Sequence, residues 1–111
     1  MNRRDQIDLD EFGRFGEPAL LILISLADGP KHGYAMTEDI AAIADVRLGP
    51  GTLYGAITRL ESRGLIEPVE SQDRRNPYRI TALGERALRL RLATLEVVAR
   101  AGRARLTRSE T

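Results

Sequence analysis

Apolar residues in the middle of the chain follow the spacing of one helix face. They fall at i, i+3, i+4 and i+7 and are Leu53, Ala56, Ile57 and Leu60. This spacing predicts an amphipathic helix whose apolar stripe packs on a core. Pro50 suits the first helical position because its missing N–H would be unpaired there anyway, and Gly64 suits a left-handed residue just past the end. The pattern therefore predicts a helix over residues 50–63.

The opposite face of this helix carries hydroxyl groups, guanidinium groups and small residues. The polar residues expected to face solvent are Thr52, Tyr54, Thr58, Arg59, Ser62 and Arg63, and the small residues are Gly51 and Gly55. Their side chains can donate hydrogen bonds to phosphate oxygens or base edges, and the two glycines leave room for another backbone. Because most surface helices are amphipathic, the neighbouring segments decide whether this helix reads DNA.

Two further helices are predicted before it. Residues 18–27 are almost all apolar, so a helix there is covered on most sides and forms the centre of the core. Asp28-Gly29-Pro30 ends it, and a second helix follows from about residue 34 to residue 44. The inward stripe of this second helix is expected to be Met36, Ile40, Ile43 and Ala44. Residues 1–16 fit a frayed terminus and an arm packed on a partner subunit equally well.

A hairpin is predicted after the central helix. Residues 65–70 are typical of a strand, and Pro68 within them favours an edge position. Residues 78–81 form the returning strand, and the loop between the strands carries Arg74 and Arg75. A hairpin directly after a helix-turn-helix is a wing, and an arginine pair at its tip is expected to contact phosphate.

The last segment is predicted to be one long helix, with Thr81 as its N-cap, that reaches about residue 106. Two apolar stripes run along it. The first is Leu83, Ala87, Leu90, Val97 and Ala101, and the second is Leu88, Leu92, Leu95, Val98 and Leu106. A small domain can cover one stripe, so the surplus apolar surface indicates a two-fold helical dimer. We expect its contacts to be made by Leu88, Leu92, Leu95 and Val98.

Composition argues against catalysis. The chain has no cysteine and one histidine, His32, which cannot form a metal site alone and is expected to serve in a turn or cap. No nucleophile has a local partner and no glycine-rich phosphate loop is present, so we expect neither an enzyme nor a bound cofactor. The longest apolar run, residues 19–27, is too short to span a bilayer, and the absence of cysteine suits the reducing cytoplasm.

The net charge of +1 conceals an uneven distribution. Residues 1–45 carry 4 basic and 9 acidic side chains (−5), residues 46–81 carry 6 and 4 (+2), and residues 82–111 carry 7 and 3 (+4). Nucleic-acid binding requires a basic surface locally rather than a high overall charge. The distribution is therefore compatible with DNA binding.

In order and spacing, four motifs of the chain resemble the PadR family of bacterial winged helix-turn-helix transcriptional regulators. They are Gly29-Pro30-Lys31-His32-Gly33-Tyr34, Gly51-Thr52-Leu53-Tyr54, Leu60-Glu61-Ser62-Arg63-Gly64-Leu65-Ile66 and Tyr78-Arg79-Ile80-Thr81-Ala82-Leu83-Gly84. The resemblance implies homodimers formed by the C-terminal helix, recognition helices in successive major grooves of a pseudo-palindromic operator, and wings on the flanking backbone. In many members a small aromatic or drug-like ligand relieves repression.

The chain departs from the family pattern in three places. Gly49 stands where serine is frequent, and Pro77 replaces an aromatic residue that usually precedes Tyr78. The chain has no tryptophan, so a ligand pocket built on stacked indoles cannot be transferred to it, and the identity of any effector is left open.

Together these observations predict a mainly α fold with a small β-hairpin, in one winged helix-turn-helix domain with a long C-terminal dimerisation helix. We expect an N-terminal arm or short helix over residues 1–16, the DNA-binding domain over 17–81, and the dimerisation helix and tail over 82–111. The function predicted is a dimeric repressor in the cytoplasm, bound to double-stranded operator DNA. The alternative is a winged-helix module that binds another protein without DNA.

Overall fold

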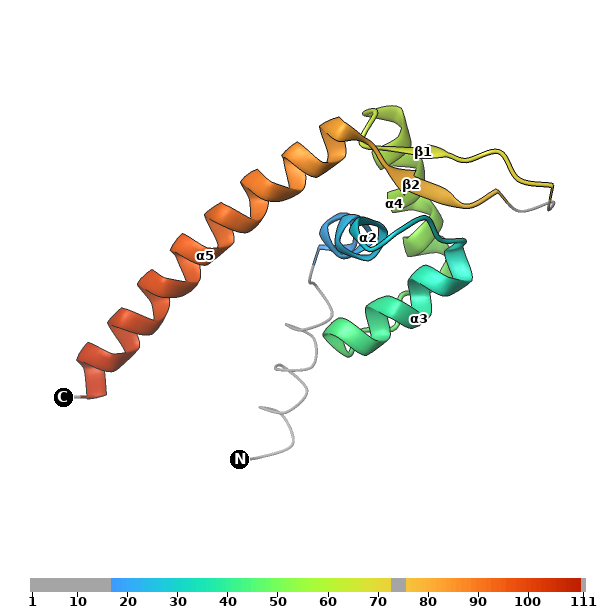
Figure 1. The fold of residues 1–111 in the computed structure, drawn as a ribbon. Helices are drawn as coiled ribbons and strands as arrows, with labels where there is room; N and C mark the ends of the chain where they lie inside the picture. Colours follow the sequence, from blue (N-terminus) through green and yellow to red (C-terminus); the bar gives the residue numbers. More distant parts are fainter. Residues whose placement is uncertain (1–16, 73–75, 111) are drawn as a thin grey trace.

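The computed structural model describes residues 17–72 and 76–110, so the predictions for residues 1–16 and for Arg74 and Arg75 lie outside the described residues. Along the chain the elements are α2 (Pro18–Ala27), α3 (Gly33–Ala44), α4 (Pro50–Ser62), β1 (Ile66–Pro68), β2 (Tyr78–Ile80) and α5 (Ala82–Glu110). Figure 1 shows a helical body with a short hairpin on one side and a long helix extending from it. The predicted fold class is confirmed.

Helix α2 is the centre of packing, as predicted. It contacts α3, α4, α5 and β2, and Figure 1 shows it between the other elements. Its buried apolar residues are Ile22, Leu23 and Leu26. Helix α3 adds Met36 and Ile40, which are fully buried. The prediction for Ile43 is wrong: this side chain is 53% exposed, and the residues that α3 buries are Gly33, Met36 and Ile40.

A polar link holds the turn between α2 and α3. Ser25 is fully buried in α2, and its Oγ donates a hydrogen bond of 2.6 Å to Oδ2 of Asp39 in α3. Nζ of Lys31 donates to the carbonyl oxygen of Ser25 at 2.5 Å and lies 3.9 Å from the same Asp39 oxygen. The turn is therefore tied to both helices that it connects.

The two strands form an antiparallel hairpin with Ile66 opposite Ile80 and Pro68 opposite Tyr78. Each strand has three residues, shorter than predicted, and β2 ends at Ile80 because Thr81 already caps the next helix. Lys31, in the turn before α3, exchanges two backbone hydrogen bonds with Tyr78, of 3.0 and 2.9 Å. The hairpin is thereby attached to the helical body at a point that the sequence pattern did not indicate.

The junction between α4 and α5 depends on Thr81 and two glycines. Gly64 ends α4 in the left-handed region with φ of 76°, as predicted. Oγ1 of Thr81 donates to the carbonyl oxygen of Gly64 at 2.6 Å and accepts from the backbone N–H of Gly84 at 3.0 Å. A Cβ on Gly84 would lie 2.0 Å from the carbonyl oxygen of Leu65, so α5 can cross this backbone only at a glycine.

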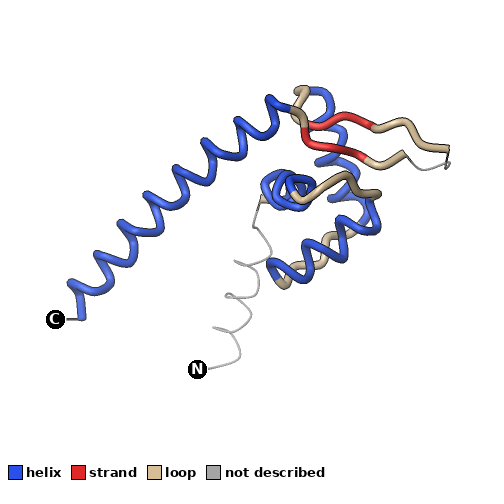
Figure 2. Tube along the Cα trace, in the orientation of Figure 1, coloured by secondary structure: helices blue, strands red, loops and turns tan. Residues whose placement is uncertain are grey.

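Helix α5 has 29 residues, and most of its length lies away from the helical body (Figure 2). Its first turns contribute to the core: Leu88 is only 7% exposed, and Leu92 packs against the same cluster. The large apolar residues that α5 exposes are Leu83, Leu90, Val97, Val98 and Leu106. The expectation that Leu88 faces a partner is therefore wrong, because this chain's own core covers it.

Candidate nucleic-acid interface

Helix α4 presents the predicted division between a buried and an exposed face. It begins at Pro50, and its buried residues are Leu53, Ala56, Ile57 and Leu60. The predicted DNA-binding residues on the other side are all exposed: Gly51, Thr52, Tyr54, Thr58, Arg59 and Arg63. Apart from its neighbours along the helix, no described atom lies within 4 Å of a Cβ added at Gly51. No other described backbone therefore approaches Gly51 closely. This face of α4 is therefore accessible to solvent in the described structure.

Arg59 of α4 and Arg63 at its C-cap differ from nearby arginines in their electrostatic surroundings. Arg47 and Arg79 pair with Glu38 and Glu67, at 2.9 and 2.6 Å. Within the described part of the chain, neither Arg59 nor Arg63 has a carboxylate within pairing distance. Their guanidinium groups are therefore available to an external anion.

The pair formed by Arg47 and Glu38 connects the loop before α4 to α3. Two hydrogen bonds, of 2.9 and 3.5 Å, join the guanidinium to the two carboxylate oxygens. They lower the pKa of Glu38 and raise the pKa of Arg47. Both side chains are exposed, so this contact orients the loop but contributes little to the free energy of unfolding.

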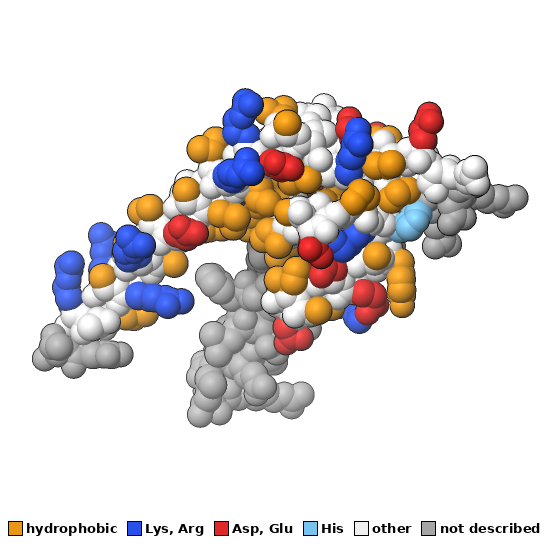
Figure 3. All heavy atoms as spheres, viewed as in Figure 1, with side chains coloured by type: hydrophobic (Ala, Val, Ile, Leu, Met, Phe, Trp, Pro, Cys, Tyr) orange, Lys and Arg blue, Asp and Glu red, His pale blue; other side chains and the backbone are white. Residues whose placement is uncertain are grey.

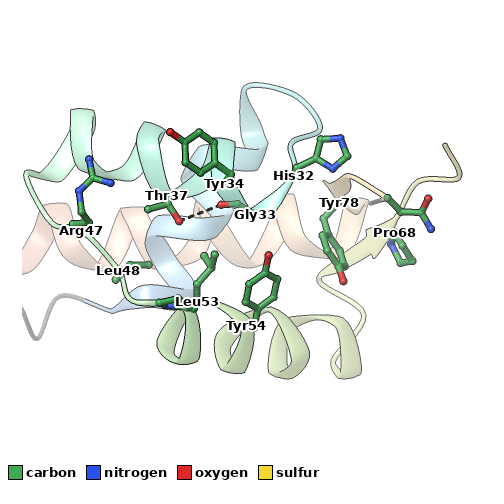
Figure 4. Close-up of a pocket in the computed structure, with 12 residues that line it drawn as sticks. His32, Gly33, Tyr34, Thr37, Arg47, Leu48, Leu53, Tyr54, Pro68 and Tyr78 are labelled. Carbon is green, nitrogen blue, oxygen red and sulfur yellow. Dashed lines mark hydrogen bonds between the residues drawn. The ribbon is translucent and has the colours of Figure 1, made fainter. Parts of the chain in front are cut away.

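A hollow of about 780 Å³ lies between the start of α3, the start of α4 and the hairpin. Figure 4 shows Tyr54 rising from α4 toward Gly33 of α3, with Tyr78 of β2 beside it. Tyr78 is half-buried, and this burial raises its pKa above the ordinary value, with smaller effects from Glu61 and Tyr54. Tyr34 also lines the hollow from α3. Aromatic and hydroxyl groups from three elements therefore converge beside the exposed face of α4.

His32 occupies the N-cap position of α3, but its side chain makes no capping hydrogen bond. Among the described residues its Nδ1 is buried and has no hydrogen-bond partner. In the same part of the chain no group of three or more histidine, cysteine, aspartate or glutamate side chains could hold a metal ion. His32 is therefore a residue of the turn before α3, at the edge of the hollow.

Charge is distributed unevenly over the surface. Figure 3 shows basic side chains along α5 and acidic side chains gathered over α3. An ion pair between Arg91 and Glu17 joins α5 to the residue before α2. No helix in residues 17–72 or 76–110 is long and apolar enough to cross a membrane.

The prediction from sequence found the exposed side chains of α4 but missed the residues that surround them. Gly33 and Tyr34 of α3 and Tyr78 of β2 line the hollow beside Tyr54. Tyr78 lies in β2 and forms a bridge with Lys31 of the turn before α3, a pairing that the sequence pattern did not indicate. The roles of the predicted DNA-binding residues stay predictions.

A protein-family model and several known proteins match this chain. The model of the transcriptional regulator PadR-like family matches residues 22–90. A relative from Streptomyces fradiae, described as an uncharacterized 37.1 kDa protein in transposon TN4556, is 44% identical over 75 residues, which are 68% of this chain and 22% of that protein. The chain thus spans about a fifth of the length of that relative.

Two relatives match over most of both chains. The transcriptional regulator Rv3488 of Mycobacterium tuberculosis is 37% identical over 84 residues, which are 73% of this chain and 78% of that protein. The crystal structure of a PadR family transcriptional regulator from Eggerthella lenta has a TM-score of 0.75 and 30% identity, and the match covers 88% of this chain and 90% of that chain.

Proposed function

The chain belongs to the PadR-like family of transcriptional regulators, and we propose that it is a dimeric repressor whose helix α4 enters the major groove of a pseudo-palindromic operator. PadR-like proteins are transcriptional regulators and not enzymes, as expected from the composition. A repressor of this kind acts on chromosomal DNA in the cytoplasm.

The main support for this proposal is that two exposed arginines at α4 have no ion-pair partner among the described residues. Arg59 and Arg63 extend from the exposed face of α4 without a carboxylate partner among the described residues, whereas Arg47 and Arg79 are paired. A cation that already pairs with a carboxylate binds phosphate less favourably, because the carboxylate repels the phosphate charge. Hydroxyl groups of Thr52 and Tyr54 on the same face add hydrogen-bonding groups for base edges or backbone.

Binding of duplex DNA is tested by fluorescence anisotropy, with a duplex selected by the wild-type protein from a random-sequence library and with an unselected duplex. Arg59→Ala should lower affinity for the selected duplex by about fivefold or more, as expected for loss of one base or phosphate contact. Arg89→Ala is the matched control, because it removes the same charge on α5, where Arg89 pairs with Glu85. Equal losses for both variants would contradict a specific role of α4.

The wing is proposed to contact the DNA backbone through Arg74 and Arg75, which lie outside the described residues. Each arginine that neutralises a phosphate changes the slope of log affinity against log salt by about 0.9. A double alanine variant removes up to four contacts from a dimer, so the slope should become shallower by roughly two to four units, with similar losses for selected and unselected duplexes. An unchanged slope would refute the proposed contacts.

Dimerisation is proposed to use the apolar surface of α5. Val98 is 60% exposed, and Leu92 and Leu95 are half-buried on the same stripe. No other described segment covers Val98, and burial against a second α5 would remove this apolar surface from water. Light scattering should give the mass of two chains at micromolar concentration. The alternative, a module that binds only another protein, predicts no salt-dependent binding to duplex DNA.

A further inference from the structure

The ring of Tyr54 lies against the backbone of α3 at Gly33. A Cβ on Gly33 would stand 2.6 Å from Oη of Tyr54, 3.1 Å from its Cζ, and 3.4 Å from Cδ2 of Leu53. Carbon atoms that are not bonded do not approach a phenol oxygen this closely. The ring can therefore occupy its position only while residue 33 has no side chain.

The backbone gives no other reason for a glycine at this position. The positive-φ glycines of the described chain are Gly29 and Gly64, so Gly33 has a backbone that other residues adopt. It is the first residue of α3, and glycine is a weaker helix former than alanine. The contact with the tyrosine ring is thus the feature of the structure that requires glycine.

The side chain of Tyr54 contacts α3 on one side and is exposed on the other. It is 52% exposed although its hydroxyl end contacts α3, and it lines the hollow beside the exposed face of α4 (Figure 4). A tyrosine on an open helix surface would sample several rotamers and would lose this freedom on binding. A ring that is already fixed binds with a smaller entropic cost.

We propose that Gly33 is a positioning residue for DNA recognition: it admits the Tyr54 ring against α3 and so fixes the direction of the Tyr54 hydroxyl at the DNA interface. This inference rests on the proposed function of α4. The atom that an alanine would displace is the far end of a flexible side chain, so the fold adjusts by turning the ring. Gly33→Ala should therefore reduce DNA affinity while the melting temperature stays close to that of the wild type.

A double-mutant cycle tests the coupling between the two residues. The probe is the duplex selected by the wild-type protein from a random-sequence library. Gly33→Ala and Tyr54→Ala should each lower affinity about tenfold, which is the effect of one specific contact. The variant with both changes should bind like Tyr54→Ala alone, within about twofold. Gly102→Ala is the control for adding a methyl group to a helix, because no described atom lies within 4 Å of its added Cβ.

Two outcomes of the cycle would overturn the inference. Wild-type affinity in Gly33→Ala would show that the ring position does not matter, and a further loss in the double variant would show that Gly33 acts without Tyr54. If Tyr54→Ala binds like the wild type while Arg59→Ala does not, this inference fails and the proposed function stands. If the wild-type protein selects no duplex, the proposed function fails and with it the role of Gly33 in DNA recognition.

The contact itself is measured without DNA. In the wild-type protein, NMR should detect a nuclear Overhauser effect between the α-protons of Gly33 and the ring protons of Tyr54. In Gly33→Ala the ring signals of Tyr54 should shift, whereas in Gly102→Ala they should not. Absence of the effect in the wild type would refute the positioning role, whatever the affinities are.

Discussion

Replacing Gly84 by alanine distinguishes intrinsic helix propensity from tertiary contact, because the two predict changes of opposite sign in the free energy of unfolding. Gly84 lies in the first turn of α5. In an open helix, replacing glycine by alanine stabilises the fold by about 1 kcal/mol. In this structure the new Cβ would lie 2.0 Å from the carbonyl oxygen of Leu65 and 2.8 Å from Cγ1 of Ile80. The first of these neighbours is backbone and cannot turn aside.

Relief of this overlap requires α5 to move away from Leu65 by more than an ångström. Overpacking of this kind costs about 1–3 kcal/mol. The same movement stretches the hydrogen bonds that Thr81 makes to Leu65 and Gly64, of 3.1 and 2.6 Å. Each contributes about 1 kcal/mol to the free energy of unfolding. These losses exceed the gain in propensity, so Gly84→Ala should destabilise the protein by about 3 kcal/mol.

The assay is thermal unfolding followed by circular dichroism at a fixed protomer concentration, since association shifts apparent stability. A loss of about 3 kcal/mol should lower Tm by roughly 12 °C in a chain of this size. Gly102→Ala is the matched control in the same helix, where no described atom lies within 4 Å of the added Cβ, and it should raise Tm slightly. A Tm for Gly84→Ala equal to or above that of the wild type would refute the argument.

Four further predictions concern two core residues, a tyrosine and the surface of α5. Ser25→Ala removes the 2.6 Å hydrogen bond to Asp39 and should cost about 1–3 kcal/mol in urea unfolding; an unchanged midpoint would contradict it. Burial raises the pKa of Tyr78, so the stability from its neutral phenol persists below the ordinary pKa of 10.0 and is lost as pH rises through the folded pKa. Tyr78→Phe should accordingly be less sensitive to unfolding at alkaline pH, and parallel losses in both proteins would exclude this cause. Leu88→Ala should destabilise the fold by about 2–5 kcal/mol, whereas Val98→Arg should leave a folded chain that light scattering finds as a monomer.

Features encoded by residues close in sequence could be predicted. Pro50 and Gly64 marked the ends of α4 correctly, because a missing N–H and a left-handed backbone are local requirements. The spacing of the apolar residues in α4 also identified its buried face, since a single stripe has only one possible core to face. Thr81 was recognised as a cap for the same local reason.

Features that depend on residues distant in the sequence could not be predicted. Both apolar stripes of α5 repeat at helical spacing, so the pattern could not show that Leu88 is covered by this chain's own core. The spacing of residues along α5 also could not show that Gly84 lies against the carbonyl group of Leu65. The contact between Gly33 and Tyr54 joins residues about twenty positions apart and appears only when α3 and α4 are packed.

The hydrogen bonds of Thr81 turn α5 into a lever whose short end is fixed to α4. With about 1.5 Å of rise per residue, the 29 residues of α5 span roughly 43 Å. A tilt of about 5° at Thr81 would displace the far end by roughly 4 Å. In the proposed dimer each α5 is fixed to its own winged-helix domain. The angle at which the two α5 helices cross therefore sets the distance between the two α4 helices. The spacing of operator half-sites then depends on how rigidly Thr81 holds α5. Weaker hydrogen bonds at Thr81 would broaden the range of half-site separations that the dimer tolerates.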